Sequence, residues 1–368
     1  IVTTLNIFRS RLKTYDNYFS DSELPTVTVA IPARNETPEL ERCLTSLLSS
    51  DYPKLEIIVL DDCSQDSTPD ILKSFAHDGV RFVKGSQPDD SWLPKNYAYQ
   101  KLSEEASGDY LLFCGVDTKF ETSTIRQLVT YISNHRLAML SVLPLRFSGA
   151  SMDSFIQPMR YWWELSLPRW ALSRPPVLST CWLIKKSALT SLGSLESVKR
   201  SILPERYFAR ELNRQSRYQF IRSNPQLGLQ TIKPYSDQLQ TAIRVRYPQV
   251  HRRPELVFLI LITEIVGLLG PYFVLVFSIF THLETKIIAT SILCIVLLTI
   301  NHLIIVGVSN PSNVPLAMFN LPFVICTELY LGLLSMIKYE FGRVEWKERN
   351  ICIPVMHVYP HLPPPGSA

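Results

Sequence analysis

The chain of 368 residues lacks a strong excess of charge of either sign. Its formal net charge is +4, and no basic stripe with interleaved aromatic residues stands out, which is what nucleic-acid binding would require. A modest positive charge suits a membrane surface better. We therefore expect no nucleic-acid partner and an association with membrane.

Paired cysteines are also missing. The seven cysteines are odd in number, scattered and without any CxxC pair, so neither a disulfide framework nor a zinc site is indicated. We expect core thiols in a reducing compartment. The chain begins with Ile and shows no signal peptide, so we expect residues 1–25 to be a lead that continues from a truncated anchor or a linker.

Charge is nearly absent from residues 256–337, where the charged side chains are Glu264, Glu284, Lys286 and Glu328. Three apolar segments, at about 256–280, 287–308 and 316–337, are each long enough to span a hydrocarbon core of about 30 Å. Glu264 and Glu328 lie within them as functional candidates, or else cap a helix end or pair across helices. Prolines predict kinks at Gly270-Pro271, Pro315 and Pro322.

The rest of the chain is organised around Val27–Glu36, a strand that ends in polar residues. Its β-branched residues have no helical period, and Pro32 cannot donate to a ladder, so we expect the strand to end there. Leucines at helical spacing predict a helix at 38–49, and a second strand at 55–60 completes a βαβ unit. Both strands then end at the edge where open parallel sheets bind ligands.

Polar residues follow each of the next strands. Asp62 follows the second strand and can accept from a base imide or a ribose hydroxyl, whereas we assign Asp66 to capping of a helix at 69–76. Lys95 lies in the first turn of a helix, where a cation gains nothing from the helix dipole, so it indicates a phosphate; a solvated lysine is the alternative. Asp117 follows the fourth strand, at 109–113, and is the candidate ligand for a divalent ion on a diphosphate.

In combination, PARNE after the first strand, the Asp pair after the second, the K-x-x-A helix start and GDYLLF followed by Asp117 resemble the family 2 glycosyltransferases of the GT-A fold, over about residues 26–246. The resemblance implies a Rossmann-like α/β GT-A domain at 26–250, followed by a C-terminal transmembrane helical region. It also implies an enzyme that uses a nucleotide-sugar donor, usually UDP-linked, with Mn²⁺ or Mg²⁺ on the diphosphate.

The same resemblance implies roles for individual residues. The nucleotide pocket would be lined by Pro32, Ala33, Asn35 and Glu36, with Asp62 on the uracil and Lys95 near the diphosphate. Asp117 takes the place of the final Asp of the D-x-D motif, as the metal ligand, whereas the first Asp is replaced by Gly115. Arg244 or Arg246 loosely matches a basic segment near the diphosphate, and both could instead pair with lipid phosphates.

The acceptor half resembles the family in parts. VLSTCWLI at 177–184 predicts a strand, with Ser179 in place of the family's glycine. Glu205 stands where a family helix carries its general base, an aspartate; such a base contributes about 10²–10⁴-fold. The alternative is that Glu205 only stabilises the first turn of its helix. One base and a direct in-line attack predict inversion at the anomeric carbon.

Two further segments indicate a membrane. Ser154–Trp170 interleaves three tryptophans with Arg160 and Arg169, which is typical of a membrane interface, although a packed core helix is the alternative. The basic tail at 338–350 resembles the G-x-V-x-W-K-x-R segment that follows the last span in members acting on carotenoid-, hopanoid- or ceramide-type lipids, which implies a lipid or polyprenyl acceptor. The Pro-rich end of the 338–368 region is expected to be disordered.

Cytosolic nucleotide-sugar places the catalytic domain of this multi-pass protein in the cytosol, and the basic tail favours the same side. The number of crossings is then even, with 256–280 as the expected re-entrant segment, because Gly270-Pro271 divides it into two short pieces. Gly115 and Glu205 also leave open a second hypothesis. In that hypothesis the protein has lost catalysis and binds a nucleotide-sugar or a partner subunit.

Overall fold

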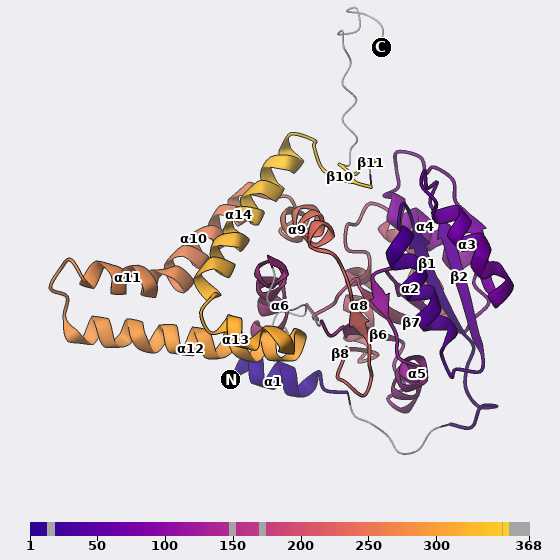
Figure 1. Ribbon diagram of the computed structural model, residues 1–368, viewed down its shortest axis with the longest axis horizontal. Helices are drawn as coiled ribbons and strands as arrows, with labels where there is room; N and C mark the ends of the chain where they lie inside the picture. The colour runs from indigo at the N-terminus through magenta and orange to yellow at the C-terminus, as the bar shows by residue number, and fades with distance from the viewer. Residues whose placement is uncertain (13–18, 147–151, 169–173, 348, 353–368) are drawn as a thin grey trace, which may run out of the picture.

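The computed structural model describes residues 1–12, 19–146, 152–168, 174–347 and 349–352. An α/β domain built on a seven-stranded sheet lies beside a group of long apolar helices (Figure 1). The strands are β1 Val27–Ala33, β2 Leu55–Asp61, β3 Val80–Lys84, β4 Tyr110–Cys114, β6 Met139–Leu143, β7 Cys181–Lys185 and β8 Tyr218–Arg222. Their order is β3-β2-β1-β4-β7-β6-β8, and β7 alone runs antiparallel to its neighbours. The predicted parallel βαβ start is confirmed.

β1 continues one residue past Pro32, so the prediction that the proline ends the strand is wrong. β1 pairs with β2 as far as Ala33, but with β4 only as far as Ala30. The Ala33 carbonyl accepts from the Asp62 amide and so faces β2. Because successive residues face opposite neighbours, the ring nitrogen of Pro32 points to the side that β4 has already left, and no ladder hydrogen bond is lost.

Helices cover both faces of the sheet. One face is covered by α2 Thr37–Leu48, α3 Thr68–Phe75 and α5 Thr124–Asn134, and the other by α4 Pro94–Glu105, α6 Gln157–Ser166, α7 Lys186–Ser191 and α8 Glu205–Arg214. Side chains of β1, β2 and β4 alternate between two apolar cores, as expected for strands buried on both faces. The domain is therefore a three-layer α/β structure.

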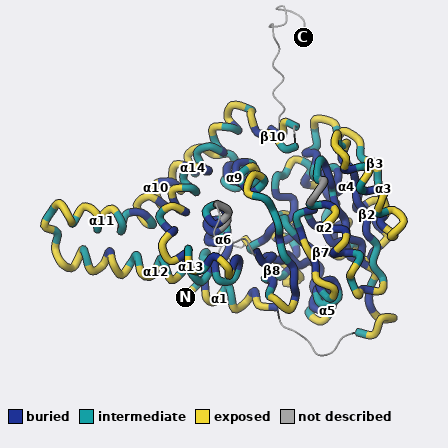
Figure 2. Tube along the Cα trace, viewed as in Figure 1, coloured by how far each residue is buried: buried dark blue, intermediate teal, exposed yellow. Residues whose placement is uncertain are grey.

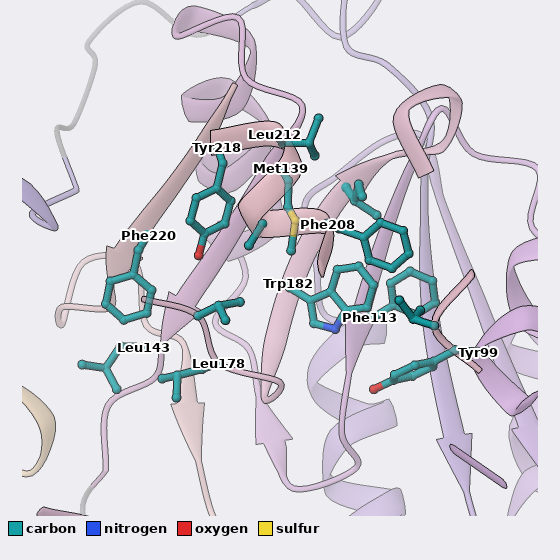
Figure 3. Close-up of a cluster of buried hydrophobic side chains, with 14 of the residues drawn as sticks. Tyr99, Phe113, Met139, Leu143, Leu178, Trp182, Phe208, Leu212, Tyr218 and Phe220 are labelled. Carbon is teal, nitrogen blue, oxygen red and sulfur yellow. The ribbon is translucent and has the colours of Figure 1, made fainter. Parts of the chain in front are cut away.

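An aromatic cluster fixes α4 and α8 on the second face (Figure 3). The Trp182 ring of β7 stacks on Phe113 of β4 with centroids 4.3 Å apart, and on Phe208 of α8 at 6.2 Å. Tyr99 of α4 packs against Phe113 at 4.7 Å. Fully burying each of these rings contributes roughly 1.5–3 kcal/mol. The helices that begin at Pro94 and Glu205 are thus held on one rigid stack.

β7 starts later than the expected strand at 177–184. Both backbone polar groups of Leu178 bond to the hydroxyl of Ser141. The Leu178 amide donates to Ser141 Oγ at 2.9 Å, and the Leu178 carbonyl accepts from that hydroxyl at 3.1 Å. The partner strand β4 also ends at Cys114, opposite Cys181. The segment before Cys181 therefore has no ladder to join.

α6 is a packed helix, so the interface prediction is wrong for Trp162. That side chain is 6% exposed within the core of the second face, and its ring lies 6.4 Å from His302 of an apolar helix. Trp163 is half-buried, and its indole donates to Glu264 Oε1 at 3.1 Å. Arg169 and Trp170 lie outside the described residues. Trp162 and Trp163 therefore join the sheet domain to the apolar helices.

The lead contains a helix, α1 Val2–Arg9, which packs on α6 and on the apolar helix α12. Asn6 Nδ2 donates to the carbonyls of Leu165 and Leu167 at 2.7 and 3.0 Å. The N-terminal helix is therefore packed against both the sheet domain and the apolar helices.

Three helices are long and apolar enough to cross a membrane, by length and composition. They are Pro254–Ser278, formed by α10 Pro254–Glu264, a π-helical turn Ile265–Leu269 and α11 Gly270–Ser278; α12 Thr285–Ser309; and α14 Leu321–Glu340. The hairpin of α11 and α12 extends away from the sheet domain and is largely exposed (Figure 2). α14 instead packs along α9 Tyr235–Gln249 and α10.

The prolines of this region act differently from one another. The chain stays helical through Gly270-Pro271, so the two pieces are not separated as predicted, but α10 and α11 run in different directions (Figure 1). Pro271 has no backbone N–H to donate, and the π-helical turn Ile265–Leu269 just before it lets the helix continue with a change of direction. Pro315 and Pro322 lie in the first turns of α13 Val314–Ala317 and α14, where proline starts a helix without bending it.

Candidate active site

The candidate site lies at the carboxyl ends of β1, β2 and β4. The sheet order reverses direction between β1 and β4, and such a switch point opens a crevice at the strand ends. A cavity of about 110 Å³ lies there. Five of the residues assigned from the sequence line this cavity: Pro32, Glu36, Lys95, Asp117 and Arg244. The sequence patterns therefore converge in space although they span more than two hundred positions.

Lys95 is placed by α4 as expected, in its first turn. Its ammonium lies 5.1 Å from the centre of the Tyr99 ring, a cation–π contact across one helical turn. Burial lowers the pKa of Lys95 to about 8, and the carboxylate of Glu205 partly opposes that shift. Among the described residues no carboxylate is hydrogen-bonded to this ammonium, and a buried cation of this kind favours the binding of an anion.

Asp117 lies in the same cavity, and Gly115 bears on its position. A Cβ atom at residue 115 would come within 2.4 Å of Asp117 Oδ1, so the glycine leaves room for the Asp117 carboxylate to fold back. Lys233 Nζ lies 3.6 Å from Asp117 Oδ2. β5 Thr118–Lys119 and β9 Gln230–Thr231 pair and bring these two side chains together. No cluster of three or more His, Cys, Asp or Glu side chains fit for a metal ion occurs among the described residues.

Glu205 begins α8 and is completely buried. Neither carboxylate oxygen has a hydrogen-bond partner in the described part of the chain. Burial raises the pKa of Glu205 above its usual range, while the positive charge of Lys95 acts to lower it. Buried carboxylates with raised pKa values occur often at catalytic sites, so Glu205 stays a candidate general base, although it is not among the residues that line the strand-end cavity.

Asp62 and the adjoining strand ends stand beside the cavity. Asp62 is 2% exposed, and its pKa is raised by burial, against the opposing effect of Arg349. Asn35 has a φ of 51°, and its side-chain oxygen accepts from the Gln65 amide at 2.9 Å. Ala33 is buried in the strand. Asp66 accepts from the Thr68 amide at 3.0 Å, which confirms its turn role at the start of α3.

The two arginines of α9 have separate environments. Arg244 lines the cavity, and burial lowers its pKa. Arg246 turns to the other side and forms a buried ion pair with Glu328 of α14 at 2.6 Å. From the sequence, either arginine could lie near the diphosphate or pair with lipid phosphates. Because the two residues are two positions apart on a helix, their side chains point in different directions.

Sequence reasoning missed several residues of the site. Arg146, Arg160, Lys233 and Trp346 all line the cavity. Arg146 and Lys233 stand in no motif, whereas Arg160 and Trp346 belong to segments that the sequence assigned to a membrane interface and to the basic tail. Arg160 also lines a second cavity, of about 550 Å³, enclosed by α6, α8, α9, α10 and α14. Arg160 thus forms part of the wall of both cavities.

Comparisons with known proteins agree with this geometry. Residues 28–193 match the profile of "Glycosyl transferase family 2". The chain is 29% identical over 181 residues to the "Probable glycosyltransferase YdaM" of Bacillus subtilis, which covers 46% of this chain and 43% of that protein. It is 32% identical over 116 residues to the "Glycosyltransferase AglE" of Haloferax volcanii, covering 30% and 37%. The chain thus matches well under half of the length of these relatives.

A third relative and one solved structure are also similar to this chain. The "4,4'-diaponeurosporenoate glycosyltransferase" of Staphylococcus haemolyticus is 27% identical over 138 residues, covering 37% of this chain and 36% of that protein. The mannosyltransferase PcManGT from Pyrobaculum calidifontis, solved with GDP-Man and Mn²⁺, has a TM-score of 0.52 at 17% identity and covers 92% of this chain and 94% of that one. The last comparison shows the fold. Residues 28–193 thus resemble the family 2 glycosyltransferases, and the chain has the GT-A fold of this structural neighbour.

Proposed function

We propose that the protein is an inverting glycosyltransferase that moves a sugar from a UDP-linked donor to a lipid or polyprenyl acceptor in the membrane. One observation carries the proposal. The strand-end cavity, which holds several candidate donor residues, shares the wall residue Arg160 with a cavity of about 550 Å³ that is lined in part by the apolar helices α10 and α14. A cavity of this size is in the range of ligand sites.

The larger cavity suits an amphipathic acceptor. Val257, Ile260 and Leu261 of α10 form an apolar wall, and the opposite wall carries Arg206 and Arg210 of α8. Phe258, Leu259 and Ile262 of α10 do not line the cavity and are exposed, on the face where a bilayer would lie. An acyl or isoprenoid chain can therefore follow α10 while its polar head reaches toward α8, at the end that adjoins the donor residues.

The chemistry proposed for the site needs one base and several cations. Glu205 takes the proton of the acceptor hydroxyl while that oxygen attacks the anomeric carbon from the side opposite the diphosphate. The bond to the diphosphate breaks in the same step, which inverts the anomeric centre. Lys95, Arg244 and Lys233 surround the cavity with positive charge and stabilise the leaving nucleoside diphosphate.

The residues present fit a divalent ion of the Mn²⁺ or Mg²⁺ type. Mg²⁺ is commonly held by one or two carboxylates together with substrate phosphates and water, and the Asp117 carboxylate in the cavity supplies the protein share. When bound, such an ion would neutralise charge on the diphosphate. Gly115 leaves room for Asp117 and adds no ligand of its own.

The membrane arrangement that we propose has an even number of crossings and a catalytic domain in the cytosol. The chain enters the apolar region from α9 and, after α14, returns to the strand ends, where Arg349 pairs with Asp62 at 2.7 Å. Both ends of the apolar region are therefore on one side. α10 and α11 form one helix of 25 residues that changes direction at the π-helical turn (Figure 1), which supports Pro254–Ser278 as the re-entrant segment and α12 and α14 as the two crossings.

Topology can be tested with a cysteine in place of Gly366, in a background without native cysteines. A membrane-impermeant thiol reagent should leave it unlabelled in intact cells and label it after lysis. Prompt labelling in intact cells would place the tail outside and require an odd number of crossings.

Activity is tested by incubating membranes that contain the protein with radiolabelled UDP-sugars and Mn²⁺, followed by lipid extraction and chromatography. We expect a labelled lipid that is absent when Glu205→Gln replaces the native protein. Tight binding of the donor without turnover, for every acceptor lipid offered, would favour the second hypothesis of a binding protein. Transfer from GDP-linked sugars alone would overturn the assignment of the nucleotide.

A further inference from the structure

The C-terminal tail crosses the ends of β1 and β2. After α14 the chain forms a short antiparallel hairpin from β10 Glu345–Trp346 and β11 Arg349–Asn350. We call residues 343–347 and 349–352 the strap. The Ile351 amide donates to the Val344 carbonyl at 3.0 Å and closes the base of the hairpin. In Figure 1 the hairpin lies between the end of α14 and the sheet domain.

Two cations of the strap are paired with candidate donor residues. Arg349 Nη1 donates to both carboxylate oxygens of Asp62, at 2.8 and 2.7 Å. Lys347 Nζ lies 3.1 Å from Glu36 Oε1 and donates to the Asn35 carbonyl at 3.2 Å. Charge-assisted hydrogen bonds of this kind are roughly twice as strong as neutral ones. The strap is therefore held by the groups that the proposed donor needs.

Arg34 ties the strap to both strand ends. Its Nε donates to the Lys347 carbonyl at 3.0 Å, and its Nη1 donates to the carbonyls of Asp62 and Cys63, each at 2.7 Å. Arg34 is 5% exposed, so these bonds are shielded from water. One side chain thus links β1, the end of β2 and the strap.

The covered site is too small for a nucleotide-sugar. Trp346 forms part of the cavity wall, and its ring lies 5.8 Å from the guanidinium carbon of Arg244. The enclosed volume is about 110 Å³, whereas sites for small molecules of this class span about 300–1,000 Å³. The strap also has a strained turn, because Lys347 has a φ of 48°, a region that few residues other than glycine adopt.

We propose that the strap is an autoinhibitory segment that occupies the base-binding end of the donor site and is displaced when the nucleotide binds. The inference rests on the proposed use of a nucleotide-sugar donor. The guanidinium N–H groups of Arg349 occupy the acceptor oxygens of Asp62 that an imide N–H of the base would use. The donor and the strap therefore compete for one carboxylate.

Competition sets the apparent donor affinity. A protein whose binding-competent state is a fraction of the total shows a dissociation constant raised by the inverse of that fraction. Arg349→Gln removes the ion pair from the covered state and leaves the uncovered state unchanged. We expect the variant to bind UDP and Mn²⁺ roughly tenfold more tightly than the native protein, because its open fraction is larger.

The experiment uses the full chain in lipid nanodiscs, with UDP binding measured by calorimetry. Arg343→Gln is the matched control, since it removes the same charge from an exposed position of the strap and should leave affinity unchanged. Lys347→Gln combined with Arg349→Gln should strengthen binding further. Equal or weaker binding by Arg349→Gln would overturn the proposal and make the strap a permanent wall of the donor site.

A second measurement does not depend on any variant. Backbone amide exchange at Val344–Cys352, followed by mass spectrometry, should become faster when saturating UDP and Mn²⁺ are added to the native protein. Slower or unchanged exchange would refute displacement. Sugar transfer to lipid, measured in the same nanodiscs, separates the two ideas: transfer with an unmoved strap defeats only the strap proposal, whereas absence of transfer from any donor defeats the proposed function.

Discussion

The ion pair between Arg246 of α9 and Glu328 of α14 provides the sharpest test of how the sheet domain joins the apolar helices. Arg246 Nε lies 2.6 Å from Glu328 Oε1 as an ion-pair contact, and its Nη2 donates a hydrogen bond to Oε2 at 2.7 Å. The side chains are only 8% and 9% exposed. Nη2 also contacts the Ile156 carbonyl at 3.3 Å.

Arg246→Met should lower the free energy of unfolding by about 3–5 kcal/mol, because it leaves the Glu328 carboxylate buried without a partner. Replacing both partners with apolar residues removes that penalty. The double variant Arg246→Met, Glu328→Leu should therefore recover most of the loss and come within about 1 kcal/mol of the native protein.

The assay is urea unfolding in detergent micelles, followed by tryptophan fluorescence. Trp162 and Trp163 lie on α6, between the sheet domain and the apolar helices, and report on this junction. A single Arg246→Met variant that unfolds at the native urea concentration would refute the reasoning. So would a double variant no more stable than the single one, since the unpaired charge would then not be the cause.

Three further predictions concern the chemistry. Asp117→Ala should abolish transfer while leaving the unfolding curve unchanged, and full activity of this variant in the presence of a chelator would contradict the metal role. Glu205→Gln should lower kcat by roughly 10²–10⁴-fold with donor affinity unchanged, whereas weaker donor binding at an unaltered kcat would make Glu205 structural. Lys95 has its pKa lowered to about 8 by burial, so it loses its positive charge as the pH rises through that value. The kcat/KM for the donor should therefore fall above about pH 8. In Lys95→Arg this decrease should move to higher pH, and an unchanged pH profile of that variant would mean that another group causes the decrease.

Local patterns predicted the donor half of the domain well. The β-branched runs Val27–Ile31 and Leu55–Leu60, which have no helical period, and the leucine spacing over 38–49 predicted the first βαβ unit, because these patterns are local properties of the sequence. The end of a strand then locates the polar residues that follow it. Parallel strands end at the same edge of the sheet, so the polar residues that follow them lie close together. Lys95 and Asp117 line one cavity for this reason.

Long-range contacts could not be predicted in this way. Arg349 lies 287 positions from Asp62, and nothing in either segment indicates the other. Lys233 reaches Asp117 only because β5 and β9 pair. A tryptophan suits a packed core as well as a membrane interface, so the residues next to Trp162 in the sequence do not show in which of the two it lies. Each of these features depends on how the apolar helices pack on the sheet domain.

The most direct test of the account is a single reaction with the purified protein in lipid vesicles. The vesicles contain lipids extracted from the native cells and receive Mn²⁺ and a radiolabelled UDP-sugar with an α linkage. We predict one nucleoside diphosphate released for each sugar that enters the lipid phase, a β linkage in the product, and no product from Glu205→Gln even though that variant binds the donor. Donor binding by the native protein without any labelled lipid, or an α-linked product, would contradict the account.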